Sequence, residues 1–213
     1  MLLCNMLPAM RPPTSTTHER AVLRLARRRG LLRTSDIVAL GVPTVVLTRL
    51  ARAGKLERTG RGVYTLVGRP ASEHRSLAEV SLRSPRGVIC LLSALRVHEI
   101  GTQAPFAVWL ALPAGVLPPR LTTPEIRVVR MSNSSLTAGV DILKVDGVEV
   151  RVFNPAKTIA DCFKFRNKIG LDVALEALRE SWREHKVSMD ALWKYAHLNR
   201  VANVMRPYLE TIT

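Results

Sequence analysis

Residues 31–66 read LLRTSDIVALGVPTVVLTRLARAGKLERTGRGVYTL, and this stretch decides the fold of the first part of the chain. The pattern predicts a short helix over residues 35–40, with Thr34 as its N-cap. Gly41 ends that helix, and the next apolar pattern predicts a second helix over residues 43–53. Two short helices joined by a turn that contains glycine are typical of a helix-turn-helix.

The residues on either side extend this pair into a winged helix-turn-helix. Upstream, an apolar stripe predicts a first helix over residues 19–29. Downstream, residues 56–58 and 63–66 read as two short strands, and a Gly-Arg-Gly turn joins them. Three helices followed by a β-hairpin predict that residues 19–70 form a winged helix-turn-helix DNA-binding domain. Residues 1–18 show no periodicity and are expected to be a disordered lead-in.

The net charge is concentrated on this same part of the chain. The 213 residues include 32 Lys and Arg against 17 Asp and Glu, which gives a formal charge of +15. Residues 1–70 contain 13 of the basic and 3 of the acidic residues, so they hold +10 of that excess. Such an excess attracts phosphate-rich or otherwise acidic partners. Arginine supplies 25 of the basic residues, which suits bidentate recognition of phosphate and guanine, although a GC-rich genome gives the same ratio.

The predicted helix over residues 43–53 divides into two faces. The buried face is expected to comprise Val46, Leu47, Leu50 and Ala51. The opposite face carries short polar side chains, a small apolar side chain and two arginines, which can contact base edges, a thymine methyl group or phosphates. Arginines alone often only solvate a helix face, but the neighbouring helices and basic hairpin favour DNA contact here. The predicted DNA-binding residues are Thr44, Val45, Thr48, Arg49, Arg52, Arg58 and Arg61.

Residues 71–213 predict a second, mixed α/β domain with a small sheet and several helices. The fold class expected for the whole chain is therefore α+β, a winged helix-turn-helix followed by a mixed α/β C-terminal domain. The predicted strands cover residues 87–89, 106–112, 126–131, 143–145 and 148–153. The predicted helices cover residues 73–82, 91–100, 155–165, 171–184 and 189–198.

The sequence contains few candidates for catalysis or ligand binding. Cys4, Cys90 and Cys162 are widely spaced, so neither a disulfide framework nor a zinc site is expected. The histidines have no metal-ligand spacing, and no phosphate-binding glycine loop or G-x-S-x-G motif occurs. We therefore expect no metal, no cofactor and no enzymatic activity. The longest apolar run is residues 107–113, and no secretion signal is recognisable, which favours a cytoplasmic protein without a membrane span.

Two groups of polar residues in the second domain leave alternatives open. Asp141, Glu149 and Arg151 resemble the strand of a metal nuclease, but arginine is a poor substitute for the usual lysine, so a nuclease is the less favoured alternative. Lys157 and Asp161 lie four residues apart on a predicted helix and are expected to form a surface pair. Arg151 or Lys157 could bind a phosphate or an acidic partner, although a well-capped docking helix explains this segment more simply.

Three stretches resemble the AbiEi-type antitoxins and transcriptional regulators of bacterial toxin–antitoxin pairs. They are residues 31–66, residues 93–113 (SALRVHEIGTQAPFAVWLALP) and residues 151–178 (RVFNPAKTIADCFKFRNKIGLDVALEAL). The resemblance implies repression of the protein's own operon through inverted repeats in its promoter. It also implies a C-terminal antitoxin domain that counteracts a co-encoded nucleotidyltransferase-like toxin. Our candidate residues in that domain are Arg151, Lys157 and Asp161. Neutralisation by direct contact, by modification of the toxin or by an indirect route stays open, as does a toxin-modifying enzyme.

Overall fold

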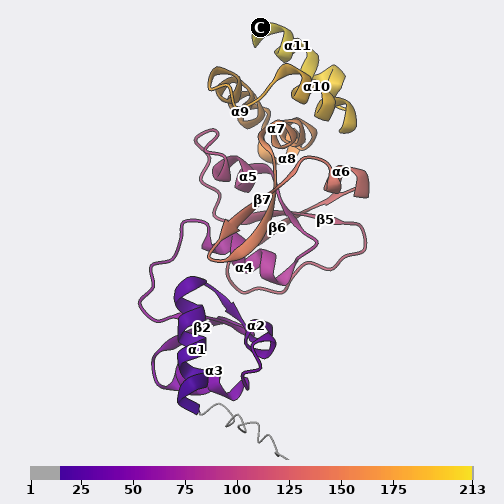
Figure 1. Ribbon diagram of the computed structural model, residues 1–213. Coiled ribbons are helices and arrows are strands. Elements are labelled where there is room, and N and C mark those ends of the chain that lie inside the picture. Colours follow the sequence, from indigo (N-terminus) through magenta and orange to yellow (C-terminus); the bar gives the residue numbers. More distant parts are fainter. Residues whose placement is uncertain (1–14, 213) are drawn as a thin grey trace, which may run out of the picture. The chain divides into compact units, whose positions relative to one another are not determined.

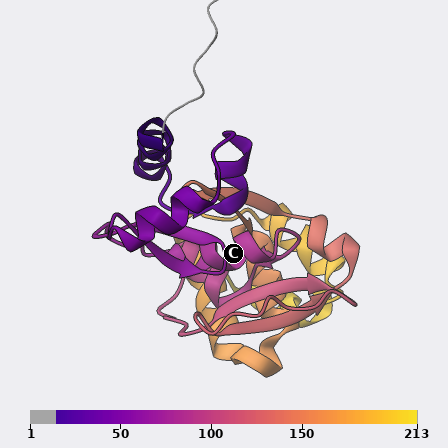
Figure 2. The same ribbon diagram turned by 90° about the horizontal axis from the view of Figure 1, so that it is seen from below.

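The computed structural model describes residues 15–212, which fold as two compact units that divide between Ala71 and Ser72. Both units are drawn in Figures 1 and 2. Both units combine helices with β-strands, so the predicted α+β class is confirmed. Among the described residues, no helix combines the length and the apolar character needed to span a bilayer.

The first unit contains three helices and a three-stranded antiparallel sheet in the strand order β1-β3-β2. The elements follow one another as helix, strand, helix, helix, strand and strand, which is the order expected of a winged helix-turn-helix. They are α1 (Ser15–Arg28), β1 (Leu32–Arg33), α2 (Thr34–Ala39), α3 (Val45–Arg52), β2 (Leu56–Gly60) and β3 (Val63–Leu66).

The boundaries of the first two helices differ from the prediction. Helix α1 begins at Ser15, so the end of the expected lead-in is helical, and the rest of that lead-in lies outside the described residues. Thr34 is the first residue of α2 rather than its N-cap, which is Arg33. The reason is the sheet: β1 pairs with β3, and the Thr34 N–H continues this ladder to the carbonyl of Gly62 at 2.9 Å. Strand pairing thus fixes where α2 starts.

The third helix starts later than predicted, at Val45, with Thr44 as its N-cap and Pro43 before it. Its inner face completes an apolar core that belongs entirely to this unit. Hydrogen bonds also tie the segment after β3 to the end of α1. Arg69 donates from Nη1 to the carbonyls of Ala26 and Arg27 at 3.2 Å. The core residues are Val22, Ala26, Leu32, Ile37, Val42, Val46, Leu47, Leu50 and Leu56.

The second unit is built on a five-stranded mixed sheet in the order β6-β5-β4-β8-β7. The pairs β5–β6 and β4–β8 are parallel, and the other two pairs are antiparallel. The strands are β4 (Val88–Ile89), β5 (Val108–Pro113), β6 (Ile126–Met131), β7 (Val140–Val145) and β8 (Val148–Phe153). The helices are α4 (Arg75–Arg83), α5 (Leu91–Val97), α6 (Asn133–Thr137), α7 (Pro155–Lys164), α8 (Arg166–Ile169), α9 (Leu171–Arg183), α10 (Met189–Leu198) and α11 (Ala202–Ile212).

Helices cover both faces of this sheet. Figure 1 shows α4 on one face and α5 with α7 on the other, followed by α9, α10 and α11 as a further layer. Helix α7 is therefore enclosed on all sides, and eight of its residues are buried. Asn154 caps α7 as predicted, because its Oδ1 accepts the backbone N–H of Lys157 at 2.9 Å. This cap fixes the residue at which α7 begins.

Several predicted boundaries in this unit are confirmed and others are wrong. Strands β6 and β8 and helix α10 have the predicted ends. Phe106 was expected in a buried strand, but β5 begins at Val108 and the Phe106 side chain is 74% exposed. On β5, strand β4 pairs with Leu110 and Ala111 and strand β6 pairs from Val108 onward, so neither neighbour extends the sheet back to Phe106. The prediction also missed α11, which contains Pro207 within its length.

Candidate nucleic-acid interface

Helix α3 separates its apolar and polar residues onto two faces. Val46, Leu47 and Leu50 are buried in the core of the first unit. The opposite face is open to solvent and combines hydroxyl groups, the isopropyl group of Val45 and two guanidinium groups. The Val45 side chain is 67% exposed. The exposed residues are Thr44, Val45, Thr48, Arg49 and Arg52. Side chains of these types at helical spacing can contact base edges and phosphates in a major groove.

Glu19 reaches into this face from α1. Its Oε1 lies 3.0 Å from Nε of Arg49. The sequence prediction missed this contact because Glu19 lies in α1 and Arg49 in α3, and no spacing pattern reports such a tertiary pair. Arg49 therefore has a carboxylate partner that restricts its orientation, and Arg52 on the next turn is exposed.

The hairpin formed by β2 and β3 carries the other two predicted arginines. Arg58 folds back onto the turn, where its Nε donates to the carbonyl of Gly60 at 3.2 Å. The ladder shifts register between Arg58 and Gly60, which marks a bulge next to the turn. Arg61 occupies the turn itself and is exposed. The hairpin thus presents one arginine that is partly committed to its own backbone and one that extends into solvent.

A second acidic residue of the first unit holds two other arginines near the start of α2. Asp36 Oδ1 lies 3.3 Å from Nη1 of Arg29 and 3.5 Å from Nη2 of Arg33. Its Oδ2 accepts the Arg33 backbone N–H at 2.8 Å, so Asp36 also completes the cap of α2. Arg27 and Arg28, in the last turn of α1, are exposed. The surface of this unit is therefore strongly basic, and Glu19 and Asp36 pair with some of its arginines.

The candidate residues of the second unit have a different role from the one predicted. Lys157 and Asp161 were expected to form a surface pair, but both side chains are 0% exposed. Nζ of Lys157 lies 2.5 and 2.6 Å from the two Asp161 oxygens. The prediction was wrong because helical spacing reports which residues are neighbours and says nothing of what covers them. Neither side chain can reach a partner at the surface.

Further polar groups complete this buried pair. Asn199 donates from Nδ2 to Asp161 Oδ1 at 2.7 Å, and Ser135 donates to the Asn199 Oδ1 at 3.3 Å. Nζ of Lys157 also lies 4.3 Å from the centroid of the Phe153 ring. Burial lowers the pKa of Lys157 and raises the pKa of Asp161, while their mutual attraction opposes both shifts. The network joins α7 to α6 and to the C-terminal end of α10.

The structure does not assemble the residues of the nuclease alternative. In the β7–β8 hairpin, Asp141 pairs with Val152 and Glu149 pairs with Lys144. Because side chains alternate between the two faces of a strand, this register places Asp141 and Glu149 on opposite faces of the sheet. Arg151 donates to the carbonyl of Arg86 at 3.4 Å. Within residues 15–212, no cluster of three or more His, Cys, Asp and Glu side chains could hold a metal ion.

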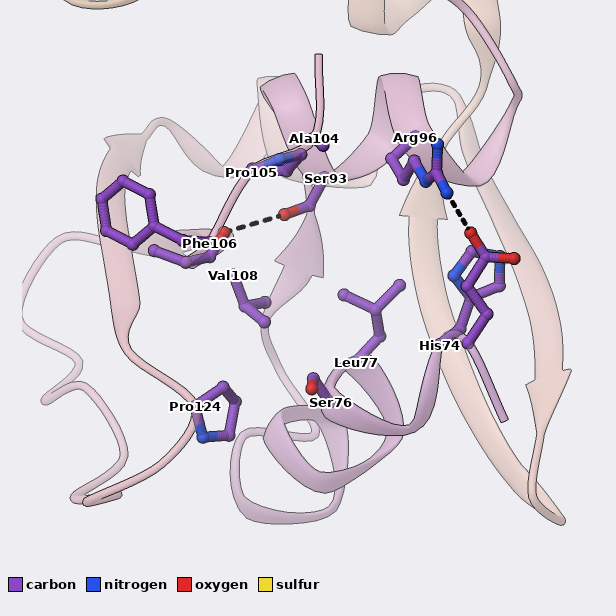
Figure 3. Close-up of a pocket in the computed structure, with 12 residues that line it drawn as sticks. His74, Ser76, Leu77, Ser93, Arg96, Ala104, Pro105, Phe106, Val108 and Pro124 are labelled. Atoms are coloured by element: carbon purple, nitrogen blue, oxygen red, sulfur yellow. Dashed lines mark hydrogen bonds and ion pairs between the residues drawn. The ribbon is translucent and has the colours of Figure 1, made fainter. Parts of the chain in front are cut away.

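The second unit also has a cavity of about 230 Å³ between α4, α5 and the segment that leads into β5 (Figure 3). Two of its polar side chains, Ser93 and Arg96, are engaged with protein groups. Ser93 donates to the carbonyl of Ala107 at 3.4 Å and accepts the Trp109 N–H at 2.9 Å. Arg96 forms an ion pair with Glu73 at the rim. His74 and Ser76 also line the cavity, and the rest of its walls are mainly apolar.

Comparisons with known proteins agree with the fold and with the resemblance in the first unit. A family model described as "Transcriptional regulator, AbiEi antitoxin" matches residues 20–67, from the first turns of α1 to just beyond β3. No curated protein matches the chain. The crystal structure of the RV2827C protein from Mycobacterium tuberculosis is similar, with a TM-score of 0.55 and 17% identity over 89% of this chain and 74% of that one. This likeness extends over both units and concerns the fold alone.

Proposed function

We propose that this protein is an antitoxin that regulates its own operon, with residues 15–71 as the DNA-binding unit. The observation that carries the proposal is the exposed, basic face of α3, which lies within the segment matched by the AbiEi regulator model. In this proposal α3 enters the major groove, and Arg61 on the hairpin contacts the backbone beside it. The target is promoter DNA with inverted repeats, as the resemblance implies, which places the protein in the cytoplasm.

A binding experiment with upstream DNA tests this part of the proposal. A duplex that spans the region upstream of the gene is titrated with the full chain, and anisotropy is followed at several salt concentrations. The wild-type protein is expected to bind, with affinity that falls steeply as salt rises because phosphate neutralisation releases counterions. The double variant Arg49→Ala, Arg52→Ala is expected to lose about 1–3 kcal/mol for each bidentate base contact removed.

A matched control separates DNA contact from net charge. Arg120 and Arg206 are exposed arginines of the second unit. Changing both to alanine removes the same charge as the α3 double variant, and this control is expected to bind upstream DNA as the wild type does. Equal losses in the two double variants, or no binding by the wild type at modest salt, would contradict the proposal.

For the second unit we propose the antitoxin role, directed at a nucleotidyltransferase-like toxin encoded beside it. The family description supports an antitoxin role for the protein, and the resemblance supplies the class of toxin. Coexpression with the neighbouring gene, followed by pull-down and intact-mass measurement of both proteins, distinguishes contact from modification. Rescue of growth without a complex or a mass change would indicate an indirect route.

We further propose that this unit acts without catalysis of its own. Asp141 and Glu149 lie on opposite faces of the β7–β8 hairpin, which argues against a shared metal. Incubation of the protein with plasmid and Mg²⁺ is expected to leave the DNA intact. Cleavage that disappears in Glu149→Ala would overturn this view and favour the nuclease alternative.

A further inference from the structure

Glu19 is a negative charge placed next to the residues proposed to meet DNA. It belongs to the first turns of α1, yet its carboxylate contacts Arg49 in the middle of the exposed face of α3. A carboxylate at this position repels phosphate and therefore weakens general attraction to DNA. Asp36, another carboxylate of this unit with arginine partners, also caps α2, which gives it a local structural role. The contact of Glu19 is instead directed at the candidate interface.

The geometry of the contact shows what Glu19 leaves available. The carboxylate oxygen approaches Nε, on the side of the guanidinium group, at 3.0 Å. The planar guanidinium carries five N–H donors in a fixed arrangement, so the four on Nη1 and Nη2 stay available at its end. Arginine reads guanine by donating two such hydrogen bonds to O6 and N7 in the major groove. Glu19 therefore holds the plane of the group and leaves its base-reading end open.

We propose that Glu19 is a specificity-determining residue that orients Arg49 to read one guanine of the operator. The inference rests on the proposed DNA-binding function of the first unit. An arginine held by a second residue loses less conformational freedom when it binds, and it has fewer ways to contact a wrong base or a phosphate. Glu19 thus lowers the affinity of the protein for DNA in general and increases its discrimination at one base pair.

The test uses duplexes of the upstream DNA in which each guanine is replaced in turn by 7-deazaguanine, which lacks the N7 acceptor. Binding of the full chain is measured by anisotropy for every duplex. The wild type is expected to lose about 5- to 150-fold in affinity at the guanine that Arg49 reads. Arg49→Ala is expected to show no loss at that position. Arg49→Lys, which keeps the charge but loses the planar guanidinium group that Glu19 contacts, is expected to show a smaller loss there than the wild type.

Glu19→Gln then tests the inference itself. This variant is expected to bind random duplex DNA more tightly than the wild type and to lose discrimination at the guanine assigned to Arg49, with other positions unchanged. Glu57→Gln is the matched control, because it removes one negative charge from an exposed position on β2 of the same unit. It is expected to keep the full penalty at that guanine.

The outcomes separate this inference from the proposed function. A Glu19→Gln protein with the wild-type penalty at every guanine overturns the inference, and so does a Glu57→Gln protein that loses the same discrimination. Failure of the wild type to bind upstream DNA overturns the proposed function, and it is seen before any variant is measured. The thermal unfolding temperature of Glu19→Gln is expected to stay close to that of the wild type, because a partly exposed ion pair contributes little to stability.

Discussion

Lys157 and Asp161 bury two opposite charges inside α7, where a fold ordinarily places apolar side chains. Transfer of each charge out of water is costly, and the short contacts between them, with Asn199, offset much of that cost. Removal of either partner leaves the other charge buried alone, at a cost of about 3–5 kcal/mol. Replacement of both by apolar residues of similar size should be neutral or stabilising. The pair therefore contributes little net stability, but each of its two charges requires the other to be present.

The two single variants are expected to respond to pH in opposite directions. In Lys157→Met, the pKa of Asp161 in the folded protein stays above its unfolded value, so stability is highest in acid and is lost as pH rises through the folded pKa. In Asp161→Leu, the folded pKa of Lys157 lies below its unfolded value, so stability is highest in alkali and is lost as pH falls. Urea denaturation at pH 5, 7 and 9 measures both slopes. Slopes of the same sign would contradict this account.

Gly139 is a second residue whose identity the buried network requires. Its φ is +65°, and an added Cβ would lie 2.8 Å from the Tyr195 hydroxyl and 2.9 Å from Cβ of Lys157. Gly139→Ala is therefore expected to cost the left-handed backbone strain and, in addition, about 1–3 kcal/mol for overpacking. Gly115 has a similar φ of +77° with open space around it, so Gly115→Ala is the control for strain alone. Equal losses of stability in the two variants would refute a packing role for Gly139.

At the scale of the element, the hairpin and α3 are expected to contribute to DNA binding in different ways. Arg61 is exposed in the turn between β2 and β3, a position suited to phosphate rather than to a base edge. Arg61→Ala is expected to lower the slope of log affinity against log salt by about 1 and to weaken all sequences alike. Titration of operator and random duplexes at three salt concentrations measures this. A change in the ratio of the two affinities would assign base contact to the hairpin.

Elements whose signals are local could be predicted from the sequence, and tertiary relations could not. Gly41 and the Gly-Arg-Gly turn divide the first unit into its helices and hairpin, because these residues act on their own few neighbours. The start of α2 depends instead on pairing of β1 with β3, which lies far along the chain. The surface assignment of Lys157 failed for a similar reason: α7 is buried around nearly its whole circumference, so it has no solvent-exposed face to distinguish from a buried one.

The candidate interface shows the same division. The two faces of α3 follow from periodicity, since apolar and polar residues alternate with the helical repeat. Glu19 could not be found in this way, because its contact with Arg49 depends on how α1 packs against α3. A sequence pattern therefore indicates which residues can meet DNA, and tertiary packing decides how one of them is oriented.

At the scale of the whole molecule, the boundary between the two units separates both the net charge and the apolar cores. Residues 1–70 carry +10 of the total formal charge of +15, so the part proposed to bind DNA holds most of the positive excess. Each unit also has a core made from its own residues, with Leu47 in one and Ile159 in the other. The remaining positive charge is spread over a unit in which acidic residues are nearly as numerous as basic ones, which suits a protein partner better than bare duplex.

Separate cores predict two unfolding transitions in calorimetry. The first unit is short, so it buries a smaller fraction of its surface and is expected to unfold at the lower temperature. Leu47→Ala should lower the free energy of unfolding of the first unit by about 2–5 kcal/mol, and Ile159→Ala should lower that of the second unit by a similar amount. Upstream DNA at about 100 times its Kd should stabilise the first transition alone, by about 2.7 kcal/mol, because binding favours only the folded form of the unit that contacts it. A single transition shifted by both variants and by DNA would mean that the two units unfold as one.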